Sequence, residues 1–478
     1  MTRLRQDSYA IEAAALEAEN PLPAFRAPEP DRAVPCAESL PAEERTGLGW
    51  AAGTRVLPYR MQDAYTRLRR PVRLPALILE NERLRATFLP GLGAKLASLV
   101  DLDTGRELLE RNPVLQFTNV ALRNAWTSGG VEWNLAQLGH HYLTCAPVFA
   151  SAIVSPGGAP GVRFHEFERC KRLLWQLDVH LPPGSAFLLV STRVVNLNLT
   201  EVPMYWWTNI GVPEGPGIRT LAPADEALGA WKDGRWSVER LPRDPDETYP
   251  ARAGRAMEQF FRLAPARRPW IASLGPDGRG LVETSTDRLR GRKMFAWGTD
   301  AAGQRWQRHL AVPGRAYYEI QAGLARTQLH SLPMPGEAAW SWTEAFGSLA
   351  ADPAVTHGPD WGAAWKHAEA ALDRALPAGE LDAWHARLTA LHGQPAGDTL
   401  QAGSGWGALE RLRMEAAGEA LPPGFAFPDA TLGPEQQPWL ALLRDGALPA
   451  GDPRADPGAW MLQPEWERLL ERSLERPA

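Results

Sequence analysis

Short runs in which apolar and polar residues alternate make up the chain from about Gly47 to Leu349. These runs are rich in β-branched and aromatic residues, and Gly, Pro and Asp separate them, which is the pattern of strands joined by turns. A stretch of this length suits two large antiparallel sheets that pack face to face. We predict strands at residues 74–80, 84–89, 94–101, 162–170, 173–180, 186–195, 202–212 and 317–323.

After Asp352 the apolar residues lie three and four positions apart, which predicts helices. The predicted helices cover residues 361–375, 381–391, 405–421, 435–443 and 466–474. The first 46 residues are rich in Pro, Ala and acidic residues, and we expect a packed or partly disordered arm there, with a short helix over residues 9–19. We therefore expect three parts, namely an N-terminal arm (1–46), a β domain (47–350) and a helical module (351–478) that resembles a truncated helical-repeat array.

The composition argues against several classes of protein. Apolar residues make up 44% of the chain and charged residues 22%, and no run reaches the roughly 18 apolar residues of a membrane span, so we expect a soluble protein. Acidic residues follow Arg3 and Arg5 where a secretory signal has an apolar core, so the cytoplasm is the expected location. The three cysteines lack the spacing of a zinc site, and a net charge of −5 gives no nucleic-acid-binding stripe. We expect no metal and no cofactor.

Twenty tryptophans are an unusual number, and a well-filled core accounts for most of them. Several, however, stand beside Asn, Glu or His. Residues 125–141 crowd Trp126, Trp133, Glu132, Asn134 and a His pair around a Gly-Gly turn. Flat apolar faces mixed with hydrogen-bonding groups are what a sugar ring needs, so carbohydrate is the predicted ligand.

Two segments carry acids on predicted strands. Alternation in residues 316–323 places Tyr317, Glu319 and Gln321 on one face. Glu319 is either a cleft carboxylate, whose pKa burial beside aromatics raises into the range of proton transfer, or a residue on a solvated face. Glu166 and Glu168 alternate about a Phe in another predicted strand, and we interpret them mainly as a solvated face.

Glu132 follows the flexible pair Gly129-Gly130, so its carboxylate either approaches a ligand, pairs with Arg123 or faces water. His140 and His141 add imidazoles that can protonate a sugar oxygen near neutral pH. A His pair without a third ligand is a poor signal for metal binding.

Adjacent tryptophans in one strand point to opposite faces, so only one of Trp206 and Trp207 can face the core. The other is either a sugar-stacking platform or part of the packing between the sheets. Two further segments combine Trp with polar or small residues. One contains Trp297 beside Gly298, and in the other Trp340, Trp342 and Glu344 share one strand face.

Taken together, several phrases resemble landmarks of the galactose-mutarotase-like superfamily, and within it of the bacterial domain-of-unknown-function family commonly placed ahead of tetratricopeptide repeats. They lie at residues 112–113, 121–126, 128–134, 203–210, 319–323 and 340–344 and span about residues 70 to 348. The resemblance implies a β-supersandwich with a sugar cleft on its concave face. Glu319-Ile320-Gln321 is similar to the Glu-x-Gln of sugar epimerases, whose Glu is the catalytic base. The strand that carries the catalytic His of epimerases holds Trp207, Thr208 and Asn209 here.

These observations predict a mainly β protein, a galactose-mutarotase-like antiparallel β-supersandwich with a C-terminal α-helical module. Glycoside hydrolases use two carboxyl groups that face one sugar. We therefore expect Glu319 and Glu132 to share the acid and base roles, with help from His141. The residues expected to bind the sugar are Trp126, Trp133, Asn134, His140, Trp206, Trp207, Asn209, Trp297, Gln321, Trp342 and Glu344, of which Glu344 is also a reserve carboxylate.

Two alternatives remain open. The first is an aldose 1-epimerase that uses Glu319 as base and His141 as a relocated acid. The second is a non-catalytic sugar-binding module whose helical tail recruits a protein partner. In every case we expect a carbohydrate ligand, and neither nucleic acid nor a membrane as partner.

Overall fold

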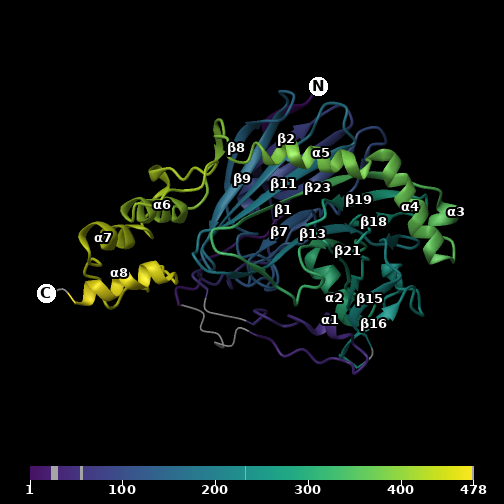
Figure 1. Ribbon diagram of the computed structural model, residues 1–478, viewed down its shortest axis with the longest axis horizontal. Coiled ribbons are helices and arrows are strands. Elements are labelled where there is room, and N and C mark those ends of the chain that lie inside the picture. The colour runs from purple at the N-terminus through teal and green to yellow at the C-terminus, as the bar shows by residue number, and fades with distance from the viewer. Residues whose placement is uncertain (23–30, 54–56, 232, 476–478) are drawn as a thin grey trace.

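The computed structural model describes residues 1–22, 31–53, 57–231 and 233–475, which form two large β-sheets with helices on their outer sides (Figure 1). Within these residues the larger sheet has 13 strands in the order β16-β15-β17-β20-β21-β13-β7-β4-β3-β2-β1-β6, with β5 paired to β4. The smaller sheet has nine, in the order β14-β18-β19-β23-β11-β10-β9-β8-β24. The fold is mainly β and antiparallel, as predicted.

The strands have the following bounds. The larger sheet contains β1 (Arg3–Ala13), β2 (Arg70–Glu80), β3 (Leu84–Leu89), β4 (Lys95–Asp101), β5 (Arg106–Glu107), β6 (Val114–Leu115), β7 (Val131–Leu135), β13 (Trp206–Pro213), β15 (Glu226–Ala230), β16 (Trp236–Arg240), β17 (Met257–Phe261), β20 (Gly291–Ala296) and β21 (Tyr317–Gly323). The smaller sheet contains β8 (Phe149–Val154), β9 (Pro160–Glu168), β10 (Leu173–His180), β11 (Phe187–Asn196), β14 (Arg219–Leu221), β18 (Trp270–Leu274), β19 (Arg279–Ser285), β23 (Ala339–Ala350) and β24 (Thr399–Gln401). A separate pair joins β12 (Val202–Met204) to β22 (Leu332–Met334).

The helices are α1 (Ala42–Arg45), α2 (Ala301–Leu310), α3 (Pro353–Thr356), α4 (Trp361–Ala375), α5 (Ala378–Thr389), α6 (Trp406–Ala416), α7 (Gln437–Asp445) and α8 (Pro464–Leu474). The predicted strand bounds agree at β3, β10 and β21, and the predicted helix bounds agree at α4. No helix of the described residues combines the length and the apolar character that crossing a bilayer requires.

The N-terminal segment differs from its prediction. The helix expected over residues 9–19 is wrong, because β1 pairs with β2 in an antiparallel register from Arg3 to Ala13. Within β1, Tyr9 and Ala13 are buried while Ser8, Ala10 and Glu12 are exposed, which is the alternation of a strand rather than the spacing of a helix.

The main core lies between the two sheets. Trp133 and Trp206 of the larger sheet meet Phe346 and Trp342 of β23 in the smaller sheet, with ring centroids 6.2 and 5.0 Å apart. These rings are almost completely buried. Large aromatic side chains therefore fill the space between the sheets.

The C-terminal helices pack on the smaller sheet in two groups (Figure 1). Helices α4 and α5 belong to the main core and contact β23, whereas α6 to α8 form a second apolar cluster with residues of β8 to β11. The strand β24 adds to the edge of the smaller sheet at β8. The solvated face expected at Glu166 and Glu168 is wrong, because both side chains are completely buried and Ser404, in the tail, donates hydrogen bonds to Glu166.

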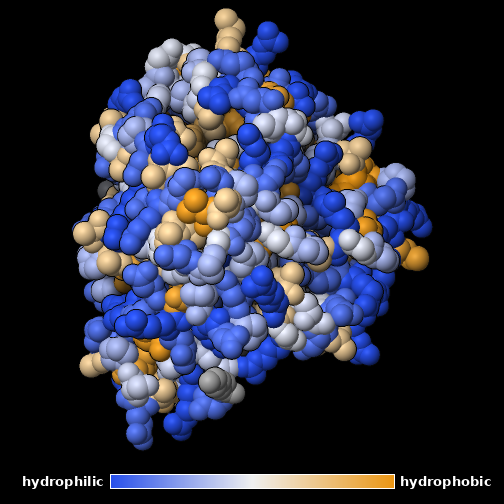
Figure 2. Space-filling model, turned by 90° about the vertical axis from the view of Figure 1, so that its right-hand side faces the viewer, coloured by the Kyte–Doolittle hydropathy of each residue, from blue (hydrophilic) through white to orange (hydrophobic). Residues whose placement is uncertain are grey.

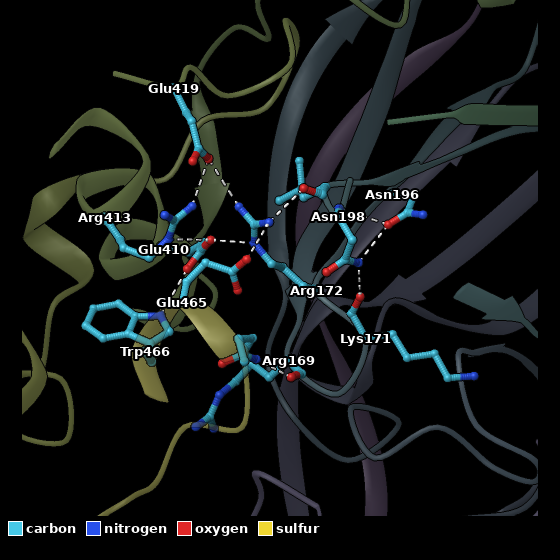
Figure 3. Close-up of polar contacts among 12 residues, drawn as sticks. Arg169, Lys171, Arg172, Asn196, Asn198, Glu410, Arg413, Glu419, Glu465 and Trp466 are labelled. Carbon is cyan, nitrogen blue, oxygen red and sulfur yellow. Dashed lines mark hydrogen bonds and ion pairs between the residues drawn. The ribbon is translucent and has the colours of Figure 1, made fainter. Parts of the chain in front are cut away.

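A network of ion pairs joins the tail to the smaller sheet (Figure 3). Arg172, which lies between β9 and β10, contacts Glu410 of α6 at 2.8 Å, Glu419 at 3.3 Å and Glu465 of α8 at 3.5 Å. The side chains of Arg172 and Glu410 are almost completely buried. One cation of the sandwich thus holds three segments of the tail.

The outer face of the larger sheet is covered by the N-terminal segment and α2. Leu40 packs in one cluster with Trp207, Trp236 and Phe260, and Gly49 hydrogen-bonds to the Leu329 carbonyl at 2.7 Å. On the side of the molecule near α3 and α4, hydrophobic residues form only small separate groups among hydrophilic ones (Figure 2). The described residues on that side therefore form no broad apolar surface.

Candidate active site

A cavity of about 570 Å³ lies on the outer face of the larger sheet, a volume typical of small-molecule sites. Strands β13, β17, β20 and β21 form its floor, and the N-terminal segment, the loop after β7 and α2 form its walls. Its lining includes Arg32, His140, Asn209, Trp236, Glu258, Phe260, Lys293, Phe295, Trp297, Trp306, Glu319, Gln321 and Gln328.

The register of the sheet aligns the polar groups of this floor. Glu132 of β7 stands opposite Asn209 of β13, which stands opposite Gln321 of β21, which stands opposite Lys293 of β20. Residues directly opposite each other in neighbouring strands project from the same face of a sheet. The four side chains therefore form one row across four strands, and Glu319 projects from the same face two residues from Gln321.

Glu132 lies beneath the cavity and is held by four donors. Trp126 Nε1 donates to Oε2 at 2.8 Å, and Oε1 accepts from Asn134 Nδ2 at 3.2 Å, from Asn209 Nδ2 at 3.3 Å and from His140 Nδ1. Burial opposes the charge of this carboxylate, but His140 and Lys95 outweigh that cost and hold its pKa below the ordinary value. Glu132 is thus a buried carboxylate held by three donors at Oε1 and one at Oε2.

The imidazole of His140 interacts electrostatically with two carboxylates, Glu132 and Glu319. Burial alone would lower the pKa of its imidazole, but Glu132 and, more weakly, Glu319 raise it above the ordinary value. Because Nδ1 is bonded to Glu132, Nε2 is the donor left for a ligand in the cavity. The two carboxylates thus favour the protonated form of this imidazole, which can donate a proton.

Glu319 lines the cavity and is only 5% exposed. Burial, reinforced by the charge of Glu132, raises the pKa of its carboxyl, while His140 acts in the opposite direction. One oxygen accepts a 2.7 Å hydrogen bond from Gln321. A carboxyl with a raised pKa beside a cavity suits the role of a general base.

A chain of hydrogen bonds continues from Glu319 to the surface. Gln328 donates to Gln321 at 2.9 Å, and the Lys293 ammonium donates to Gln328 at 2.5 Å and to Glu258 at 2.9 Å. Gln321 is therefore fixed from both sides, and it fixes Glu319 in turn.

The Gly129-Gly130 turn serves packing rather than the ligand. Both glycines have positive φ, and a Cβ atom would lie 2.8 Å from the Glu110 carbonyl oxygen at Gly129 and 2.5 Å from the Leu96 carbonyl oxygen at Gly130. Lys95 donates to the carbonyls of Thr127 and Gly129 at 2.9 Å. The turn is thereby held against the neighbouring strands and sets the start of β7, where Glu132 lies.

Residues 52–337, more than half of the chain, match the family described as a domain of unknown function, DUF5107. The chain belongs to the DUF5107 family. The family resemblance seen in the sequence motifs is therefore confirmed.

Several solved structures are similar to this DUF5107 protein. A TPR-domain containing protein from Parabacteroides distasonis is 19% identical with a TM-score of 0.60, over 73% of this chain and 55% of that one, so the chain spans about half the length of that protein. A galactose mutarotase-like protein from Clostridium acetobutylicum is 11% identical, with a TM-score of 0.40 over 57% of this chain and 95% of that one. A galactose mutarotase-like protein from Lactobacillus casei is also 11% identical, with a TM-score of 0.40 over 57% and 99%.

The DUF5107 cavity brings together five of the predicted site residues, namely Glu319, His140, Asn209, Trp297 and Gln321. Three others lie just beneath it. Trp126 and Asn134 bond to Glu132, and Glu132 itself bonds to two residues of the lining.

Trp207 shares the outer face with Asn209 but is completely buried. Its indole lies over Gly323 and Gly291, where an added Cβ would lie 2.3 and 2.8 Å from the ring. The predicted stacking platform is therefore wrong for Trp207, because this ring fills the space between the sheet and the N-terminal segment.

Four predicted sugar-binding residues face the core instead. Trp133, Trp206 and Trp342 pack between the sheets, and Glu344 accepts a 3.0 Å hydrogen bond there from Thr208. These side chains lie between the two sheets and none of them lines the cavity on the outer face, so the structure does not bring them to the candidate site. Alternation does place Trp342 and Glu344 on one face, but that face meets the other sheet.

His141 is not part of the cavity either. Its imidazole is buried against Tyr142 and Trp175, and burial lowers its pKa to about 3. Its backbone N–H donates to Asn134 at 2.7 Å. The relocated acid expected at His141 is therefore wrong, and the neighbouring His140 occupies the site.

Sequence reasoning missed Arg32, Glu258, Lys293, Trp306 and Gln328. Lys293 and Glu258 lie on strands in which no motif stands out, and their partners are distant in the chain. Only the pairing of β20 with β21, which the sequence does not reveal, would have placed Lys293 beside Gln321. Among the described residues, no three His, Cys, Asp or Glu side chains are grouped as metal ligands.

Proposed function

We propose that the cavity binds an aldose and that the protein interconverts its anomers, with Glu319 as base and His140 as acid. One observation carries the proposal. Glu319 and His140 line the same cavity, while Glu132 is not part of the lining and is held beneath it by four donors. Glycoside hydrolysis needs two carboxyl groups that reach the sugar, and the second carboxyl of the lining, Glu258, is paired with the Lys293 ammonium at 2.9 Å. The arrangement therefore supports epimerisation over hydrolysis.

The chemistry needs one proton acceptor and one proton donor. Glu319 takes the proton of the anomeric hydroxyl while Nε2 of His140 gives a proton to the ring oxygen, and the bond between C1 and the ring oxygen breaks. Rotation about the bond between C1 and C2 turns the aldehyde, and the same two groups act in reverse to close the ring as the other anomer. The electrostatic coupling between His140 and Glu319 supports this pairing.

The other groups of the lining support a sugar as ligand. Asn209 Oδ1 is buried and has no hydrogen-bond partner among the described residues, so it is available to accept a sugar hydroxyl. Trp236, Phe260 and Trp297 supply apolar faces around it.

Exchange spectroscopy by NMR tests the proposal on a panel of aldoses that includes glucose, galactose, xylose and arabinose. The protein should accelerate anomer exchange of at least one of them, and Glu319→Gln should slow it by about a hundredfold or more. Glu12→Gln, an exposed residue of β1, is the matched control and should leave the rate unchanged.

Two results would overturn the proposal. One is a panel on which no aldose exchanges faster than in buffer. The other is Glu319-dependent release of reducing ends from oligosaccharides, which would restore the hydrolase. Sugar binding without either reaction would leave the non-catalytic binding module as the function.

A further inference from the structure

A second cavity, of about 790 Å³, adjoins the candidate site. It is lined by residues ahead of β2, by the loop after β6 and by the outward side of α2. These residues are Tyr65, Arg67, Thr118, Asn119, Ala301, Ala302, Arg305, Trp306 and His309. None of the predictions made from the sequence included this surface.

Trp306 belongs to the lining of both cavities. Its half-buried ring stacks against Trp297, with centroids 5.4 Å apart and planes inclined by 28°. The consecutive residues Asn119 and Val120 likewise line one cavity each. A ligand that extends from the first cavity past Trp306 therefore enters the second, and an indole at that junction suits the face of a sugar ring.

The charge of the second lining differs from that of the first. Arg67 and Arg305 are exposed, and no acidic residue lines this cavity. In the part of the chain that the structure describes, no hydrogen bond or ion pair engages the Arg305 guanidinium. Arg67 lies 3.0 Å from His309 Nδ1, and burial together with Arg67 and Arg69 lowers the pKa of that imidazole, which favours its neutral form.

Resting on the function proposed above, we propose that the substrate is an anionic saccharide of at least two rings. Its reducing ring occupies the first cavity, its second ring stacks on Trp306, and a carboxylate, sulfate or phosphate on that ring binds Arg67 and Arg305. Guanidinium groups are suited to such anions because their N–H groups match the geometry of paired oxygens.

Isothermal titration calorimetry and anomer exchange test this proposal on matched pairs of disaccharides. The probes are cellobiose with its uronate and 6′-phosphate counterparts, and lactose with its 6′-sulfate, so that the arms separate the three sources of charge. At least one anionic probe should bind about tenfold more tightly than its neutral parent, since charge-assisted hydrogen bonds exceed neutral ones.

The variants assign the preference to this cavity. In the double variant Arg67→Gln/Arg305→Gln, the anionic and neutral probes should bind with about equal affinity. The control is Arg308→Gln, which changes an exposed residue of α2 outside both linings and should keep the tighter binding of the anionic probe. Equal binding of neutral and anionic probes, or an advantage that survives the double variant, would overturn the proposal.

The two proposals fail separately. Glu319-dependent exchange of monosaccharides without any anionic preference contradicts only the inference about the second cavity. An anionic preference that the double variant abolishes, without anomer exchange of any probe, supports the second cavity and contradicts the epimerase.

Discussion

The indole N–H of Trp126 donates a 2.8 Å hydrogen bond to Glu132 Oε2, and the Trp126 ring lies 4.7 Å from the imidazole of His140. Glu132 in turn bonds to His140 Nδ1. A buried carboxylate that is fixed by an indole and bonded to an imidazole sets both the orientation and the charge of that imidazole. In the proposed mechanism Trp126 and Glu132 therefore act as positioning residues for His140.

Substitution Glu132→Gln should lower the pKa of His140. The change removes the nearest negative charge and places an amide where four donors converge. We expect anomer exchange near neutral pH to fall by about tenfold or more, since general acid catalysis contributes at least that factor. A ¹⁵N NMR titration of His140 measures the pKa directly, with Glu12→Gln as the matched control. An unchanged His140 pKa would contradict the positioning role.

The pH dependence of kcat/KM should be bell-shaped. Activity requires ionised Glu319 and protonated His140, so it should rise with pH through the raised pKa of Glu319 and fall through the raised pKa of His140. The acidic limb therefore lies above the ordinary Glu value of 4.5 and the alkaline limb above the ordinary His value of 6.5. In Glu132→Gln the alkaline limb should move to lower pH. A profile without an alkaline limb would remove His140 from the mechanism.

Substitution Arg172→Met should destabilise the docking of the tail. It removes one of the two cations that pair with the buried Glu410. Because Arg413 still contacts Glu410 at 3.0 Å, the loss of unfolding free energy should be smaller than the about 3–5 kcal/mol of an unpaired buried charge. Urea unfolding, together with faster amide exchange in α6, measures the effect. Arg411→Met is the control, because its partners Glu415 and Asp429 are largely exposed and such pairs contribute about 1 kcal/mol or less. Equal losses in the two variants would contradict the importance of the Arg172 network.

His392 should make the fold less stable in acid. Burial, and then the charges of Arg193 and Arg163, lower the pKa of its imidazole to about 3. The unfolded chain therefore takes up this proton first as the pH falls below about 6.5, and stability is lost from there toward pH 3. Between pH 6.5 and 5 this residue should contribute a loss of about 2 kcal/mol.

Urea unfolding of His392→Gln over the same pH range checks this prediction. The variant should lose stability less steeply than the parent protein as the pH falls, and His367→Gln in α4 is the matched histidine control. Identical slopes in the parent and His392→Gln would show that His392 does not take part in the acid response.

The candidate site was predictable where its signals are local. Alternation in residues 316–323 places Glu319 and Gln321 opposite Tyr318 and Ile320, and the structure has the first pair at the cavity and the second in the core. The row that joins Gln321 to Lys293 was not predictable, because it depends on which strands pair and in which register.

The sequence by itself determined many of the strands, the change to helices after Asp352, and the face on which each side chain of those strands lies, because these follow from the local periodicity of the backbone. It did not determine β1, which pairs with β2 where a helix was expected, or α2, which lies within the predicted β domain. The tertiary structure decided what each face meets. Both faces of the larger sheet are covered, one by the smaller sheet and the other by the N-terminal segment and α2, so both carry tryptophan. Trp206 and Trp207 are therefore equally apolar in the sequence and equally buried in the fold. Only long-range packing left the cavity beside Asn209 and Glu319 open to a ligand.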